Sequence, residues 1–135
     1  MDDATLELAR GWLVKAQHDL AAAQKLASGP DPYLDTAIYH CQQAAEKAIK
    51  GLLVVHGQRF EKMHNIQLLV AQAPPFAPEL EPLLEAAERL TPYATAFRYP
   101  GETLEPDRPE FDAAMSAADE IYTSVLALVP VQAQP

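Results

Sequence analysis

Two long stretches of this chain place an apolar residue at every third or fourth position, and this spacing constrains the fold more than any other feature. In residues 3–27 the repeating set is Leu6, Ala9, Leu13, Ala16, Leu20, Ala23 and Leu26. From Asp31-Pro32 or Asp35 to about His56 it is Leu34, Ile38, Cys41, Ala45, Ala48, Leu52 and Val55. Because a helical turn takes 3.6 residues, each set lies on one face of an α-helix. Both stretches therefore predict long amphipathic helices.

Residues that start and stop helices bound these two elements. Asp3 is a suitable N-cap for the first helix, and Ser28-Gly29-Pro30 ends it. Gly57 closes the second helix, since glycine tolerates the left-handed conformation found after a helix end. Trp12 lies near the apolar face of the first helix, and we expect it to anchor the core.

Two shorter helical patterns follow. Asn65 can cap a short helix over residues 66–73, which Pro74-Pro75 ends. A fourth helix begins near Pro78-Glu79, and Thr91-Pro92 should bend it because proline has no amide proton to donate.

The last helical pattern covers residues 109–129 and completes the fold prediction. Asp107 and Glu110 have the spacing of a capping box, and the tail from Pro130 is expected to fray. No stretch alternates apolar and polar residues as a strand would. Long helices joined by short loops pack as antiparallel neighbours. The sequence thus predicts one all-α domain over residues 1–135, an antiparallel up-and-down bundle of about five helices, four long and one short.

Composition excludes several classes of protein. The formal charge of −9 over 135 residues argues against nonspecific coating of nucleic acid, because phosphate would be repelled. No apolar run approaches the roughly 18 residues of a membrane span. Cys41 is the only cysteine, so no internal disulfide can form. The N-terminus, Met1-Asp2-Asp3, is acidic where a secretory signal would be basic, and we expect the chain to stay in the cytoplasm.

The charge is unevenly distributed along the chain. Residues 36–76 have more basic than acidic side chains and hold three of the four histidines; the charged residues are Glu46, Lys47, Lys50, Arg59, Glu61 and Lys62. An anion, if one binds, is therefore expected in this segment. The alternative is that these lysines simply form the solvated face of a helix.

The common catalytic and cofactor motifs are absent. The sequence has no glycine-rich phosphate loop, no HExxH and no GxSxG. The histidines are never four residues apart, so no helix-borne zinc site is predicted; they are His18, His40, His56 and His64. We expect neither a metal nor a cofactor.

A polar set on the second helix is the best candidate for a binding surface. Gln43, Glu46, Lys47 and Lys50 have the i, i+3, i+4, i+7 spacing of one helical face, opposite the apolar one. One interpretation is a solvated face of the bundle. The other is the polar lining of a cleft, between helices or at a dimer interface, that binds phosphate or base groups.

Four short segments in a fixed order resemble one known family. They are Trp12 followed by Ala16-Gln17-His18-Asp19-Leu20, the run Gln42-Gln43-Ala44-Ala45-Glu46-Lys47-Ala48, then His64-Asn65-Ile66, and finally Arg98-Tyr99-Pro100. Together they resemble the HEPN family, the higher-eukaryote and prokaryote nucleotide-binding domain, over nearly the whole chain.

The resemblance implies both an assembly and a ligand. It implies an up-and-down bundle that is usually a homodimer, paired with a minimal nucleotidyltransferase in a toxin–antitoxin-like module. It implies binding of a nucleotide or RNA by the polar set of the second helix together with Arg98 and Tyr99. In several branches of the family the domain is a metal-independent endoribonuclease with an arginine followed a few residues later by a histidine. That histidine would act as general acid and base on the ribose 2′-hydroxyl, and the arginine would stabilise charge on the phosphorane.

Arg59 and His64 match that ribonuclease spacing literally. We expect both in the loop after the second helix, where they are not held one turn apart, and Arg98 has no histidine after it. His64 could instead order the turn at a helix entrance, and Arg98 could be a structural anchor. Three functions thus stay open: a nucleotide- or RNA-interacting domain, which we favour, an endoribonuclease toxin using Arg59 and His64, and a non-catalytic helical adaptor.

Overall fold

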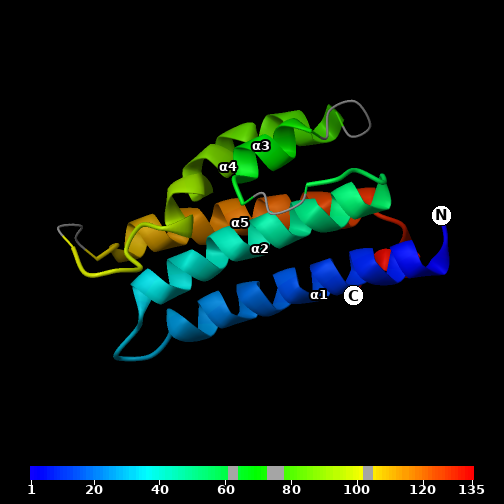
Figure 1. Ribbon diagram of the computed structural model, residues 1–135. Helices are drawn as coiled ribbons and strands as arrows, with labels where there is room; N and C mark the ends of the chain where they lie inside the picture. The colour runs from blue at the N-terminus through cyan, green and yellow to red at the C-terminus, as the bar shows by residue number, and fades with distance from the viewer. Residues whose placement is uncertain (61–63, 73–77, 102–104) are drawn as a thin grey trace.

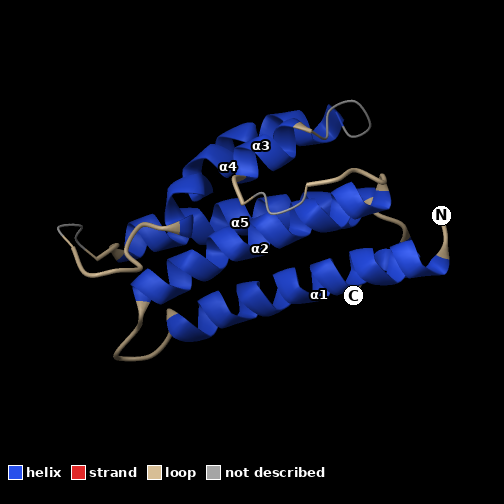
Figure 2. Ribbon diagram, viewed as in Figure 1, coloured by secondary structure: helices blue, strands red, loops and turns tan. Residues whose placement is uncertain are grey.

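The computed structural model describes residues 1–60, 64–72, 78–101 and 105–135. Three long helices dominate it: α1 (Asp3–Leu26), α2 (Leu34–Val55) and α5 (Arg108–Leu128) (Figure 1). The shorter elements are α3 (Ile66–Ala71), α4 (Leu84–Leu90) and the 3₁₀ helices η1 (Pro78–Leu83), η2 (Thr91–Ala94) and η3 (Val131–Ala133). The described residues contain no strand, which confirms the predicted all-α class (Figure 2).

The helices form an up-and-down bundle with α2 at its centre. α1 and α2 run antiparallel side by side, the chain returns through α4, and α5 runs in the same direction as α2 (Figure 1). The apolar faces predicted from the sequence meet between these helices. Gly51 lets α1 approach closely, since a Cβ there would lie 3.2 Å from Leu13 Cγ and 3.3 Å from the carbonyl oxygen of Ala9. None of the described helices is long and apolar enough to cross a membrane.

The predicted end of α2 and the predicted start of α3 are confirmed, whereas α3 ends at Ala71, two residues before the predicted end. Gly57 has a φ of 66°, and the amide groups of Gly57 and Gln58 donate to the carbonyl oxygens of Val54 and Leu53, which is a Schellman motif. Asn65 accepts a 3.1 Å hydrogen bond from the Leu68 amide and so caps α3. Pro74-Pro75, the predicted stop of that helix, lies outside the described residues.

One predicted N-cap and the predicted capping box need correction. Asp2, not Asp3, caps α1, accepting a 2.7 Å bond from the Thr5 amide. At α5, Asp107 accepts from the Glu110 amide at 2.9 Å, as the capping box requires. The Glu110 carboxylate, however, accepts a 2.7 Å bond from the Tyr93 hydroxyl instead of completing the box, and thereby ties η2 to α5.

The fourth helix and the tail also differ from the prediction. The expected continuous helix from residue 78 is a 3₁₀ turn, a short α-helix and a second 3₁₀ turn, with Pro82 inside the first and Pro92 at the start of the last. The tail does not fray. Ala133 in η3 is fully buried, and the side chain of Gln134 donates to the carbonyl oxygen of Leu126 at 2.9 Å.

Candidate functional site

The polar set of α2 is not uniformly solvated. Glu46 and Lys50 are only 3% and 4% exposed, whereas Gln43 and Lys47 are partly buried. A solvated face is therefore the wrong interpretation for Glu46 and Lys50. Burying two charges is costly unless they are paired and hydrogen-bonded, so their partners define the site.

Glu46 is the centre of a first network. One of its carboxylate oxygens accepts from Lys50 Nζ and from His64 Nδ1, each at 3.2 Å, and the other accepts from Gln42 Nε2 at 3.1 Å. Because a carboxylate can only accept, His64 Nδ1 carries a proton, and in the neutral form of the ring the lone pair lies on Nε2. The His64 side chain is 68% exposed, so this nitrogen is available to a ligand. We call Glu46, Lys50 and His64 the first triad.

Two aromatic rings cover the buried ammonium of this triad. Lys50 Nζ lies 5.3 Å from the ring centres of both Trp12 and Phe60, and the two rings meet edge to face at 5.8 Å. Trp12 was expected in the core but is only partly buried. It instead shields Lys50 from water through a cation–π contact.

A second network of the same composition joins α1 to α2. Asp19 of α1 accepts from His40 Nδ1 at 2.7 Å and from Lys47 Nζ at 2.6 Å, and only 7% of Asp19 is exposed. The Lys47 ammonium, predicted to bind phosphate, is thus bound to Asp19. As for His64, the carboxylate acceptor requires a proton on Nδ1 of His40. We call Asp19, His40 and Lys47 the second triad.

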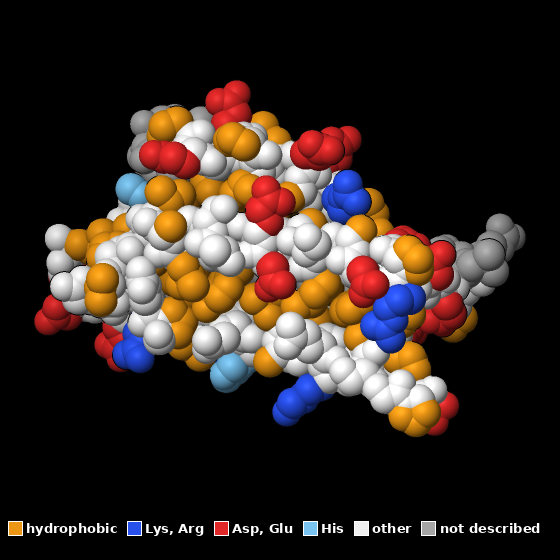
Figure 3. All heavy atoms as spheres, turned by 180° about the vertical axis from the view of Figure 1, so that it is seen from behind, with side chains coloured by type: hydrophobic (Ala, Val, Ile, Leu, Met, Phe, Trp, Pro, Cys, Tyr) orange, Lys and Arg blue, Asp and Glu red, His pale blue; other side chains and the backbone are white. Residues whose placement is uncertain are grey.

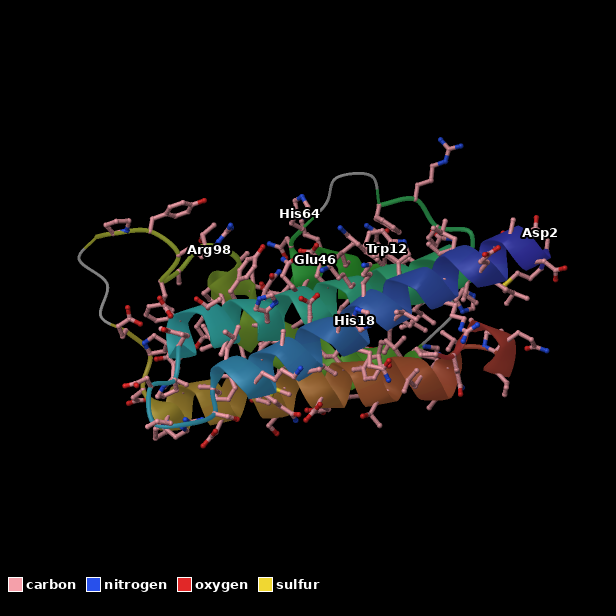
Figure 4. The ribbon with its side chains drawn as sticks, turned by 90° about the horizontal axis from the view of Figure 1, so that it is seen from below. Asp2, Trp12, His18, Glu46, His64 and Arg98 are labelled. Carbon is pink, nitrogen blue, oxygen red and sulfur yellow. The ribbon has the colours of Figure 1, made fainter. Side chains whose placement is uncertain are left out.

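His64 and Arg98 line one pocket over α2, although they come from different loops. The pocket encloses about 280 Å³, and Figure 4 shows both side chains projecting on the same side of the bundle as Glu46. We call it the His64 pocket, and its lining is Tyr39, Gln43, Glu46, His64, Ala94, Thr95 and Arg98. Of the predicted nucleotide-binding residues, Gln43, Glu46 and Arg98 line this pocket together with His64, whereas Lys47, Lys50 and Tyr99 do not.

Arg98 is oriented by its neighbours. Its guanidinium carbon lies 4.3 Å from the ring centre of Tyr39, and Nη1 donates to the carbonyl oxygen of Ala94 at 3.0 Å. Phe97, just before it, has a φ of 65°, which is rare for a bulky residue and costs of order 1 kcal/mol or more. The backbone is therefore strained at the residue that directs the Arg98 side chain over α2.

A second pocket adjoins the first. It encloses about 250 Å³ and shares Tyr39 and Arg98 with the His64 pocket. We call it the His40 pocket, and its other lining residues are Asp35, Thr36, His40 and Phe97.

Other predicted residues are not brought into the pocket. Arg59 is exposed and does not line the pocket that holds His64. Residues 61–63 between them, which include Lys62, lie outside the described residues. Tyr99 is 70% exposed, and its ring centre lies 5.4 Å from the Arg98 guanidinium carbon.

Sequence reasoning missed Asp19, His40, Tyr39 and Gln42 as parts of the site. Two signals were available. Asp19 lies between Ala16 and Leu20 on the apolar face of α1, where an acid needs a partner. Tyr39 precedes Gln43, and Gln42 precedes Glu46, by one helical turn.

Among the described residues, the buried groups with clear pKa shifts do not line the His64 or the His40 pocket. Burial, with a smaller effect of Asp119, raises the pKa of Cys41 to about 12. Burial and the bond to Glu110 raise the pKa of Tyr93 to about 12. A thiol so rarely ionised is not a nucleophile at neutral pH. Within the described residues, no three acidic, histidine or cysteine side chains gather as a metal site would need.

Comparison with known proteins identifies the family. The model of the HEPN domain matches residues 9–128. The chain belongs to the HEPN family. This confirms the resemblance found in the four short segments and places the chain among domains that are generally related to nucleotides or RNA.

Two solved structures share the HEPN fold with this chain. TT1696 from Thermus thermophilus is 33% identical with a TM-score of 0.80, and the match covers 91% of this chain and 99% of that one. ST0689, an archaeal HEPN homologue, is 28% identical with a TM-score of 0.70, covering 90% and 98%. No curated protein matches the chain.

Proposed function

We propose that this HEPN domain binds a nucleotide or an RNA segment, with the phosphate in the His64 pocket. The observation that carries the proposal is that Arg98 and His64 line one pocket above the buried carboxylate of Glu46. A guanidinium has a planar array of donors that matches phosphate oxygens. When its ring is protonated, an imidazole whose Nδ1 is tethered can also donate from Nε2 to a second phosphate oxygen.

The electrostatics of the groove favour an anion despite the acidic chain. Lys50 compensates the charge of Glu46 in the pocket lining, which leaves the guanidinium of Arg98 as the remaining charged group of the lining. The opposite face of the bundle, seen in Figure 3, carries acidic side chains over α4 and α5. A polyanion would be repelled from that face and would approach the groove side.

The test is a binding titration with a nucleoside 5′-monophosphate and a short oligoribonucleotide. Arg98→Ala should weaken binding by roughly tenfold or more, the usual effect of losing a hydrogen bond to a charged group. Arg10, an exposed arginine of α1, supplies the matched control Arg10→Ala. Binding should weaken as salt is raised, because phosphate contacts carry it. Equal affinity in wild type and Arg98→Glu would refute the proposal.

A second candidate function is metal-independent cleavage of RNA, and the tether of His64 favours it. A histidine whose Nδ1 is held by a carboxylate presents Nε2 as a base, an arrangement found in general acid–base catalysis. Expression in bacteria of the wild type, His64→Ala, Arg98→Ala and Arg59→Ala tests this function. Slow growth and RNA cleavage lost in His64→Ala would support it, and the two arginine variants would show which one stabilises the phosphorane. Intact RNA with the wild type would argue against it.

We further propose the assembly that HEPN membership suggests, a homodimer working with a minimal nucleotidyltransferase. Light scattering during size-exclusion chromatography would measure the dimer. Co-purification with the product of a neighbouring nucleotidyltransferase gene would test the partner. A tight complex whose formation is independent of nucleotide would instead favour the adaptor function.

A further inference from the structure

We infer that the groove has two subsites and that its ligand is a linked pair of nucleotides rather than a single one. The inference rests on the proposed function and adds the His40 pocket as the place of the second unit. The phosphodiester would lie at Arg98, which belongs to both pockets.

The shared wall is the first observation. Tyr39 and Arg98 line both pockets, so the two hollows of about 280 and 250 Å³ are neighbours along α2 rather than separate sites. Tyr39 and Gln43 are one turn apart, and His40 lies beside Tyr39, so the groove follows the helix axis. A mononucleotide in the His64 pocket, with its phosphate at Arg98, would leave the His40 pocket empty.

The second observation is that both pockets contain the same kind of histidine–carboxylate pair. Each pocket contains one histidine whose Nδ1 is bound to a buried carboxylate, Glu46 for His64 and Asp19 for His40. Each carboxylate is also paired with a lysine, so neither leaves an uncompensated negative charge beneath the groove. Two imidazoles, each bound to a carboxylate through Nδ1, therefore line the pockets that share Arg98, and both can contact a strand that crosses it.

The two pockets differ in what they accept. Asp35 lines the His40 pocket, and its carboxylate would repel a second phosphate there. Phe97 and Tyr39 supply aromatic rings to the same pocket, and aromatic rings stack on bases at about 1–3 kcal/mol each. The His40 pocket therefore suits the second nucleoside, with Asp35 accepting from a base amino group or a sugar hydroxyl, while the phosphodiester lies at Arg98, between this pocket and the unit in the His64 pocket.

The experiment compares a nucleoside 5′-monophosphate with a dinucleotide of the same base whose 2′-hydroxyl is methylated to prevent cleavage. The wild type should bind the dinucleotide roughly tenfold more tightly, the gain expected from one stacked base. His40→Asn keeps a donor for Asp19 but removes the atom in the position of Nε2. It should bind the monophosphate as the wild type does and lose most of the dinucleotide gain. The control is His18→Asn, an exposed histidine of α1.

The outcomes separate the inference from the proposed function. Wild-type binding of the monophosphate with no gain for the dinucleotide would overturn the second subsite and leave the His64 pocket standing. The second subsite would also be overturned if His40→Asn weakened the binding of both ligands equally. No binding of either ligand would overturn the proposed function, and the inference with it. Thermal unfolding of His40→Asn within a few degrees of wild type shows that the second triad still joins α1 to α2.

Discussion

The two triads contain the same three kinds of side chain but lie in different surroundings. In the first, the carboxylate and the lysine both belong to α2, are less than 5% exposed, and lie under Trp12 and Phe60. In the second, Asp19 of α1 reaches across to α2, and the side chains of His40 and Lys47 remain 27% and 26% exposed. One triad thus forms the floor of a pocket, and the other joins two helices at the edge of the groove.

The difference shows that burial, not composition, sets the energetic role of a charge cluster. A charge that loses its partner in a dry site keeps its desolvation penalty, whereas one near water can be solvated again. The same mutation should therefore have unequal effects in the two triads.

The largest effect is expected for Glu46→Ala. This change leaves the Lys50 ammonium buried without its carboxylate and removes the partner of Gln42, and we expect it to destabilise the fold by about 3–5 kcal/mol. Denaturant unfolding followed by fluorescence of Trp12, the only tryptophan, measures it directly. A loss below about 1 kcal/mol would mean that Lys50 reaches water and that the first triad is not dry.

A smaller effect is expected for Asp19→Ala. Lys47 and His40 lose their partner but can turn toward solvent, so we expect a loss of about 1–3 kcal/mol. The same unfolding assay applies, and Asp112→Ala on the exposed surface of α5 is the control. If Asp19→Ala proves as costly as Glu46→Ala, the contrast between the triads is wrong.

The sequence predicted the fold well because local rules decide it. Apolar spacing located the long helices, and Asn65 and Gly57 act through backbone geometry that involves only neighbouring residues. Where local rules compete with tertiary contacts, the prediction failed. Glu110 bonds Tyr93 instead of closing the capping box, and the tail packs on the bundle because Ala133 and Gln134 find partners there.

The site was predicted only in part, for the same reason. Spacing placed Gln43, Glu46 and Lys50 on one side of a helix, but it carries no information about which side chain turns to a distant partner. Lys47 turns to Asp19, 28 positions away, and Trp12 covers Lys50. Those contacts depend on how α1 packs against α2.

The buried thiol of Cys41, on the core side of α2, gives a test that depends on pH. Because burial raises the pKa of Cys41 to about 12, its folded state holds the proton where the unfolded thiol, with a pKa near 9, has lost it. Above about pH 9 the unfolded chain therefore binds fewer protons than the folded protein. The free energy of unfolding then falls as the pH rises. From pH 8 to 10, the stability of the wild type relative to Cys41→Ala should fall by about 1 kcal/mol. A constant difference would show that the thiol ionises in the folded protein.

The smallest change in stability is expected when both charges of the first triad are removed together. Glu46→Gln with Lys50→Met keeps an acceptor for Gln42 and leaves no buried charge, so stability should stay within about 1 kcal/mol of wild type. Glu46→Gln alone should cost more, because Lys50 remains unpaired. His64 loses its carboxylate in the double variant, and nucleotide binding should weaken although the fold is intact. Such a result would mean that the buried pair is maintained for the pocket and not for stability. If the double variant is as unstable as the single one, the ion pair itself holds the fold together, and the first triad would then resemble the second in being mainly structural.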